Sequence, residues 1–174
     1  GLHGVGASVV NALSEWTEVK VFHDGKIYFQ RFERGVPTCD MKIVGETDKK
    51  GSEIKFKADK EIFSETDVYD FAILETRLRE QAFLNAGVNI VLTDERTPEN
   101  STSEQFHYEG GLSSVVEYIH KKRSLDVVHP DVIAFSKSMP DDSAQVELAM
   151  QYNESYNELI LSFANNIHTT DGGT

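Results

Sequence analysis

An Asp-Gly pair between two alternating apolar runs is the feature that most constrains how this chain can fold. The runs are residues 19–22 and 27–32, and Asp24-Gly25 lies between them. Such a pair favours the two-residue turn of a β-hairpin, because both residues tolerate the positive φ that the turn requires. Two more short strands are predicted at 41–44 and 54–56, on either side of a polar turn. The first part of the chain is therefore expected to form an antiparallel sheet.

A glycine-rich opening segment leads into a short helix that is predicted at residues 7–14. This segment, the glycine loop, reads Gly1-Leu2-His3-Gly4-Val5-Gly6-Ala7-Ser8. Glycines let the backbone approach a ligand, and the free N–H groups and positive dipole end of the following helix suit a phosphate. The third glycine of a Rossmann fingerprint is missing at Val9, and Ala7 stands where a Walker loop needs lysine. On spacing alone, nucleotide binding and a plain helix-entry turn both stay open.

The middle of the chain carries the most regular helical periodicity. Apolar residues recur at steps of three and four over 68–85, and Gly87 stands where a C-cap would be expected. A buried strand is predicted at 88–93. The polar stretch 97–104 is expected to be an exposed loop.

A second unit is predicted to begin near Tyr108, where Glu109-Gly110-Gly111 interrupts the regular pattern of the chain. An apolar helix face follows over 112–119, and the cations of 121–123 end that helix where they complement its dipole. Alternating residues at 146–152 predict a strand, and the run 159–167 predicts another.

The composition limits the classes of function. Lys+Arg number 17 against 29 Asp+Glu, so the net charge is −12, and phosphate-backbone binding by the whole surface is not expected. The single cysteine, Cys39, excludes a disulfide framework and a zinc site built from several thiolates. No apolar run approaches the roughly 18 residues of a membrane span, so we expect no membrane partner.

The remaining titratable residues favour no catalytic site. Six scattered histidines show no metal-ligand spacing, and each is expected to be a surface or packed imidazole, except His3 inside the glycine loop. Acidic pairs such as Asp94-Glu95 are expected to be solvated surface charge. Because the chain begins at Gly1 without methionine and stops at Thr174 in a glycine turn, we expect it to be a piece of a longer protein.

Ordered motifs along the whole chain resemble the ATPase subunits of type II DNA topoisomerases, which are members of the GHKL ATPase family. The opening residues 1–14 are similar to the third nucleotide-binding motif of that family. The matches continue, in order, through Arg34-Gly35-Val36-Pro37, Gly45-Glu46-Thr47-Asp48, Arg77-Leu78-Arg79-Glu80, Ala82-Phe83-Leu84-Asn85, Phe106-His107-Tyr108-Glu109-Gly110-Gly111, Asn165-Asn166-Ile167-His168-Thr169 and Gly172-Gly173-Thr174.

The resemblance implies an α+β fold in two incomplete parts. Residues 1–107 would be the C-terminal half of a Bergerat-type (GHKL) α/β sandwich. Residues 108–174 would be the first half of a transducer domain with a ribosomal-protein-S5-like fold. Half a sandwich leaves a sheet edge unpaired, so we expect the isolated piece to be marginally stable.

The resemblance also implies where ATP binds. Backbone amides of the loop would fold over the triphosphate, and Ser52 would lie next to the adenine pocket, where the family usually has threonine. The ATP-binding residues are then Gly1, Leu2, His3, Gly4, Val5, Gly6, Ala7 and Ser52. The family's general base and its magnesium ligand would lie upstream of Gly1, and the lysine that reaches the γ-phosphate downstream of Thr174. No catalytic or metal residue is therefore assigned in this chain, although ATP and Mg2+ are the implied cofactors.

The implied activity is ATP-driven closure of a dimer gate around double-stranded DNA. The protein would form a homodimer on ATP binding and an A2B2 complex with a second kind of polypeptide, in the cytoplasm. Gly35-Val36-Pro37 favours the family member that supercoils DNA over the one that decatenates it. The decatenating enzyme and a non-catalytic nucleotide-binding or interaction module stay open as alternatives. We expect the isolated 174 residues to lack measurable ATPase activity and to bind ATP weakly.

Overall fold

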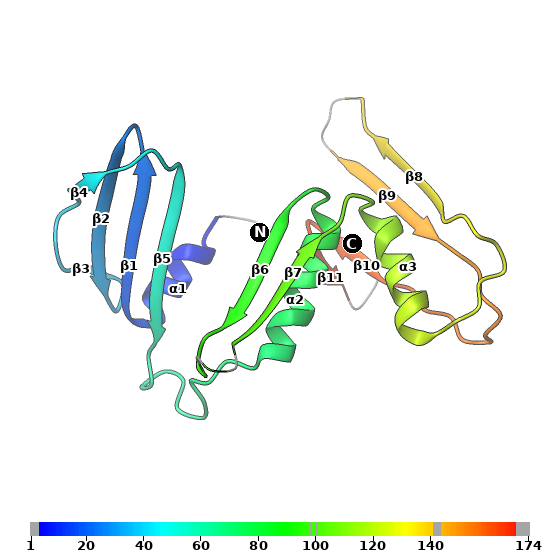
Figure 1. The fold of residues 1–174 in the computed structure, drawn as a ribbon, viewed down its shortest axis with the longest axis horizontal. Helices are drawn as coiled ribbons and strands as arrows, with labels where there is room; N and C mark the ends of the chain where they lie inside the picture. The colour runs from blue at the N-terminus through cyan, green and yellow to red at the C-terminus, as the bar shows by residue number, and fades with distance from the viewer. Residues whose placement is uncertain (1–3, 98, 100, 141–143, 170–174) are drawn as a thin grey trace. The chain divides into compact units, whose positions relative to one another are not determined.

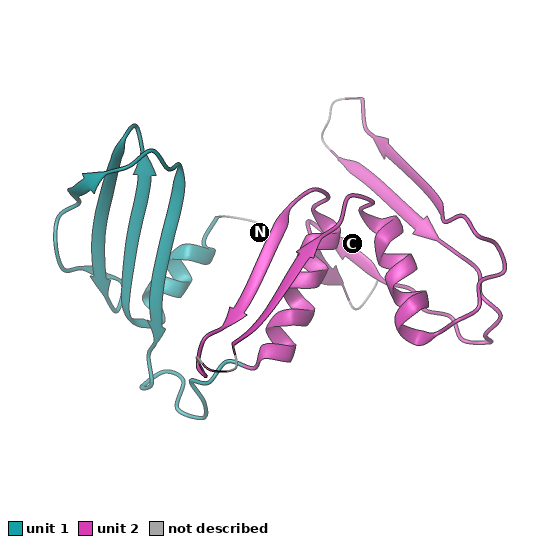
Figure 2. Cartoon of the chain, viewed as in Figure 1, with its two compact units in different colours: residues 1–69 teal, residues 70–174 magenta. Residues whose placement is uncertain are grey.

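The chain folds into two compact units, residues 1–69 and 70–174 (Figure 2). The structure is a computed structural model, and it describes residues 4–97, 99, 101–140 and 144–169. Runs of antiparallel strands follow each of the three α-helices in the described part of the chain, which confirms the expected α+β class. The division into units lies at Tyr69–Asp70. The assignment of two domains at 1–107 and 108–174 stays a prediction.

The first unit is a short helix followed by a five-stranded antiparallel sheet (Figure 1). Strand β1 is central, with β5 on one side and β2 on the other, and β2 also pairs with β3 and β4. The elements are α1 (Gly6–Ala12), β1 (Ser14–His23), β2 (Lys26–Glu33), β3 (Val36–Pro37), β4 (Lys42–Glu46) and β5 (Gly51–Ala58).

The hairpin predicted from Asp24-Gly25 is confirmed. Both turn residues have positive φ, 48° at Asp24 and 76° at Gly25, as a two-residue turn that matches the strand twist requires. The turn sets the register, in which Phe22 faces Ile27 across the two strands. The two later strand predictions are also confirmed, although β4 and β5 pair with β2 and β1 and not with each other.

The two faces of this sheet differ in character. Directly paired residues share a face, so one face carries cross-strand ion pairs: Arg31 Nη1 lies 2.6 Å from Glu18 Oε1, and Lys20 Nζ lies 3.3 Å from Glu53 Oε1. The register places Val19 and Ile54 on the opposite face. There Ile54 is exposed, so the apolar face is only partly covered by the described residues.

Within its described residues, the second unit contains two α-helices and three two-stranded antiparallel sheets. Helix α2 packs on the β6–β7 hairpin, and α3 packs against the β8–β9 hairpin and against α2 (Figure 1). The elements are α2 (Phe71–Leu84), β6 (Asn89–Asp94), β7 (Thr102–His107), α3 (Leu112–Arg123), β8 (Ile133–Ser138), β9 (Gln145–Met150), β10 (Ser162–Ala164) and β11 (Ile167–Thr169). No helix in the described part of the chain is long and apolar enough to cross a membrane.

Aromatic rings form the core of the second unit. Phe106 of β7 is 1% exposed and Phe83 of α2 is 4% exposed. The Phe83 ring stacks on Tyr108 with 3.8 Å between centroids and packs at 5.4 Å from Tyr118 of α3. Arg79 lies over the Phe106 ring and donates a hydrogen bond of 2.9 Å to the Tyr118 hydroxyl. These contacts join α2, α3 and the β6–β7 hairpin.

Two predicted segments differ from the structure. The stretch 97–104 was expected to be a loop, but β7 begins at Thr102. Its first residues face solvent and are polar, and the Thr93 and Ser103 hydroxyls bond across the strands, so polarity concealed the strand. The run 159–167 was expected to be one strand. It forms the β10–β11 hairpin instead, because Asn165 and Asn166 take positive φ and reverse the chain.

The predicted helix over 68–85 is confirmed as α2, but its end is formed differently. Asn85 is the C-cap, and Gly87 lies beyond it in the turn to β6, where its N–H donates to the Tyr108 carbonyl at 3.0 Å. The helices predicted at 7–14 and 112–123 are confirmed as α1 and α3 with shifted bounds, and the strands predicted at 88–93 and 146–152 as β6 and β9. Strand β8 had no predicted counterpart.

Asp70 starts α2 as its N-cap, since its Oδ1 accepts a 3.0 Å hydrogen bond from the Ile73 N–H. We expect Asp70→Ala to lower the free energy of unfolding of the second unit by about 1 kcal/mol, because a helix donor loses its acceptor. Faster hydrogen exchange of the first-turn amides of α2 measures this loss. Asp70→Asn retains an acceptor oxygen and should stay close to the unmodified chain; equal losses in both variants would contradict the capping role.

Candidate nucleotide-binding site

The structure describes the second half of the glycine loop. Gly1, Leu2 and His3, which belong to the predicted ATP site, lie outside the described residues. Gly4, Val5, Gly6 and Ala7 are described, and all four are exposed. They lead directly into α1, which begins at Gly6, one residue before the predicted start at residue 7.

Gly4 and Gly6 are glycines for reasons other than packing. A Cβ added at either position would meet no atom within 4 Å. Gly4 has a φ of +64°, a conformation that other L-residues rarely adopt. Gly6 is the first residue of α1, and no side chain covers its backbone. Both positions therefore leave room for a ligand to approach the main chain closely.

The first turn of α1 also differs from that of α2 in its hydrogen bonding. Val5 is the N-cap of α1 and makes no side-chain cap bond, and the first turn contains no acidic residue. The Val5 carbonyl accepts from the Val9 N–H at 2.9 Å, so the helix itself is formed. The first N–H groups of a helix have no partner within it. In α1 these N–H groups lack a side-chain cap and lie at an exposed helix start, together with the positive end of the helix dipole. Such an arrangement suits an anion.

Ser52 lies on β5, well along the sheet from the end of α1. Ala58 pairs with Ser14, the residue that starts β1 after α1, whereas Ser52 pairs with Val21. Six residues at about 3.3 Å each place Ser52 roughly 20 Å from Ala58 along the strand. Ser52 is exposed, and within the described residues no hydrogen bond joins it to the glycine loop. Ser52 and the described part of the glycine loop, residues 4–7, therefore belong to one unit, with Ser52 at a distance along the sheet from α1.

A buried carboxylate supports the far end of α1. Asp59 has a side chain only 4% exposed; its Oδ2 lies 2.8 Å from Arg34 Nε, and its N–H donates to the Leu13 carbonyl at 3.1 Å. Arg34 also contacts Glu61 at 2.7 Å. Hydrogen bonds to Glu61 and Asp59 raise the pKa of Arg34 above its ordinary value. Next to it, a Cβ on Gly35 would lie 3.4 Å from the Ala12 backbone. This network, which sequence reasoning missed, holds the β2–β3 turn against α1.

Two of the histidines are paired with neighbouring side chains. His107 pairs with Glu109 at 2.8 Å, and His120 is buried with its Nε2 3.2 Å from Asn153 Nδ2. Across the described ranges, no group of three or more His, Cys, Asp or Glu residues is arranged to hold a metal ion. The described residues therefore provide no set of side-chain ligands for Mg2+.

Comparison with known sequences connects the whole chain to one group of proteins. A family profile described as DNA gyrase B matches residues 111–174. The DNA gyrase B protein of Bacillus mycoides is 52% identical over 174 residues, and that of Staphylococcus aureus is 50% identical over 174 residues. Both alignments cover 100% of this chain, but 42% of the first relative and 26% of the second. The chain thus spans less than half the length of these curated relatives.

A solved structure has the same fold. It is the 43K ATPase domain of Thermus thermophilus gyrase B, crystallised in complex with an aminocoumarin. The TM-score is 0.84 at 36% sequence identity, and the match covers 96% of this chain and 44% of that chain. The likeness therefore extends over most of both units.

Proposed function

We propose that this chain belongs to the DNA gyrase B family and is part of the ATP-binding region of a DNA gyrase. Gly1, Leu2, His3, Gly4, Val5, Gly6 and Ala7 form the loop that holds the triphosphate, and Ser52 lies beside the adenine. The observation that carries the proposal is the uncapped, acid-free start of α1 behind Gly4, in a chain similar over 96% of its length to a gyrase B ATPase domain.

The chemistry of the described residues agrees with a binding and positioning role. Main-chain N–H groups at α1 donate to phosphate oxygens and stabilise the charge that develops during phosphoryl transfer. In the proposed enzyme the general base and the Mg2+ ligands come from other parts of gyrase B, and Mg2+ would neutralise phosphate charge.

The proposed whole protein is an ATP-dependent type II DNA topoisomerase of the cytoplasm. Two copies of gyrase B dimerise when ATP binds, and they assemble with gyrase A as an A2B2 complex. Closure of the dimer captures a segment of double-stranded DNA, and hydrolysis reopens the gate. DNA contacts fall to other parts of the complex, since this chain carries a net charge of −12.

The full-length protein, combined with gyrase A and relaxed plasmid, tests the activity. We expect ATP and Mg2+ to convert the plasmid to negatively supercoiled DNA, and a non-hydrolysable ATP analogue to support no repeated turnover. Gel electrophoresis of the plasmid topoisomers is the measurement. If the protein decatenated linked circles without supercoiling the plasmid, it would be assigned to topoisomerase IV and not to gyrase. Absence of ATP binding by the full-length protein would favour a non-catalytic interaction module.

A further inference from the structure

A large pocket lies in the second unit, and all of its lining residues belong to that unit. Its volume is about 640 Å3, and α2, α3 and the segment 159–168 line it. The floor is apolar: Phe83 is buried, Ile119 and Phe163 are half-buried, and Leu161 adds an aliphatic wall. A concave, largely apolar site of this size matches the space that a small organic ligand requires.

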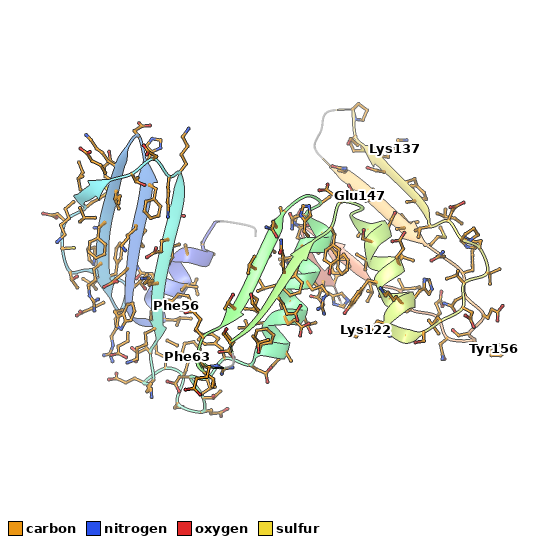
Figure 3. The ribbon with its side chains drawn as sticks, in the orientation of Figure 1. Phe56, Phe63, Lys122, Lys137, Glu147 and Tyr156 are labelled. Carbon is orange, nitrogen blue, oxygen red and sulfur yellow. The ribbon has the colours of Figure 1, made fainter. Side chains whose placement is uncertain are left out.

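The rim of this pocket carries an excess of positive charge. Lys122 and Arg123, at the end of α3, line the pocket and are exposed. Figure 3 labels Lys122 on this helix. Glu80 is the acidic residue of the lining, and it is already paired with Arg77 at 2.9 Å. Within the described part of the chain, no ion pair neutralises Lys122 or Arg123; the Lys122 ammonium lies 5.6 Å over the Tyr118 ring. A surplus of cations is notable in a chain with a net charge of −12.

The end of helix α3 does not need these two side chains for its own hydrogen bonds. The Lys121 carbonyl accepts from the Ser124 N–H at 3.2 Å, and the His120 carbonyl accepts from the Leu125 N–H at 3.0 Å. Ser124 takes a left-handed conformation with φ of 50°, which closes the helix by backbone bonds. Lys122 and Arg123 thus remain available as donors at the pocket mouth.

We propose that this pocket binds a small amphipathic carboxylate, whose aromatic or alicyclic body packs between α2 and α3 while its carboxylate pairs with Lys122 and Arg123. A carboxylate complements the surplus charge and accepts charge-assisted hydrogen bonds from both side chains. An apolar body covers Ile119, Leu161 and Phe163 and removes their exposed area from water. The site is independent of the ATP loop, so it would be a second ligand site on the protein.

Binding of 1-pyrenebutyrate to the full-length protein, followed by fluorescence anisotropy, tests the proposal. We expect saturable binding, and binding roughly tenfold or more weaker for 4-(1-pyrenyl)butylamine, which has the same ring with the opposite charge. The double variant Lys122→Glu, Arg123→Glu should weaken pyrenebutyrate binding by a similar factor. Lys121→Glu is the control, because it reverses one cation on the same helix turn outside the pocket lining, as each half of the double variant does within it, and it should leave affinity within about twofold.

A space-filling variant locates the site. Leu161→Trp should abolish binding of both pyrene probes, because the indole occupies the volume between the helices. Three results would overturn the proposal: equal affinity for the two probes, equal weakening by Lys121→Glu, or no saturable binding to the full-length protein. The last would mean that another segment of the full-length chain fills the pocket.

Discussion

Replacing Phe106 by alanine is expected to lower the free energy of unfolding of the second unit by about 3–5 kcal/mol. Phe106 is 1% exposed, and it lies beneath the Arg79 guanidinium at 5.1 Å and opposite Ile90 on β6. Alanine would leave a cavity where α2 meets the hairpin, and Arg79 would lose the ring that covers it. Few other side chains are buried within the described residues, so the loss cannot be spread over a large core.

Hydrogen exchange of α2 and β7 amides measures this loss locally. We expect protection there to fall by roughly a hundredfold or more, while the amides of β1 and β2 in the first unit keep theirs. Phe135→Ala is the matched control, because Phe135 is 56% exposed on β8 of the same unit, and its removal should cost about 1 kcal/mol or less. Comparable losses from the two phenylalanines would show that β7 is not the centre of this core.

Elements that local chemistry determines were predictable from the sequence. The Asp24-Gly25 turn requires positive φ at both residues, which few other pairs tolerate. The Asp-Gly pair and the alternating apolar residues on either side of it were therefore enough to predict the hairpin. The periodicity of α2 was equally local. Strand β7 was missed because it pairs along one side only and buries Phe106 alone, so most of its residues are polar.

Features that depend on distant pairing were not predictable. Nothing local to Arg34 indicates that Asp59 will receive its guanidinium, because the contact forms only after β5 has paired with β1 and brought Asp59 to the end of α1. The same holds for the pocket of the second unit, whose lining comes from α2, α3 and the β10–β11 region. For the candidate site, the glycine-rich segment predicted that a helix follows the loop, but the position of Ser52 relative to that helix required the sheet register.

The conformation of Gly4 makes the sharpest prediction about the nucleotide site. Its φ of +64° lies in the left-handed region, which costs an L-residue about 1–2 kcal/mol and is least accessible to β-branched side chains. Gly4→Val should therefore shift the loop away from this conformation and redirect the N–H groups that precede α1. We expect the affinity of the full-length protein for a non-hydrolysable ATP analogue to fall by roughly tenfold or more, as measured by isothermal titration.

Gly25→Val separates backbone strain from ligand binding. Gly25 has a φ of +76°, and like Gly4 it has no atom within 4 Å of an added Cβ, so the substitution imposes the same kind of strain in the β1–β2 turn. It should reduce the stability of the first unit while leaving ATP affinity close to that of the unmodified protein. If the two variants weakened ATP binding equally, the loss would come from general destabilisation of the sheet. If Gly4→Val alone had no effect, the main chain at Gly4 would not shape the phosphate site, and the assignment of residues 1–7 to ATP would fail.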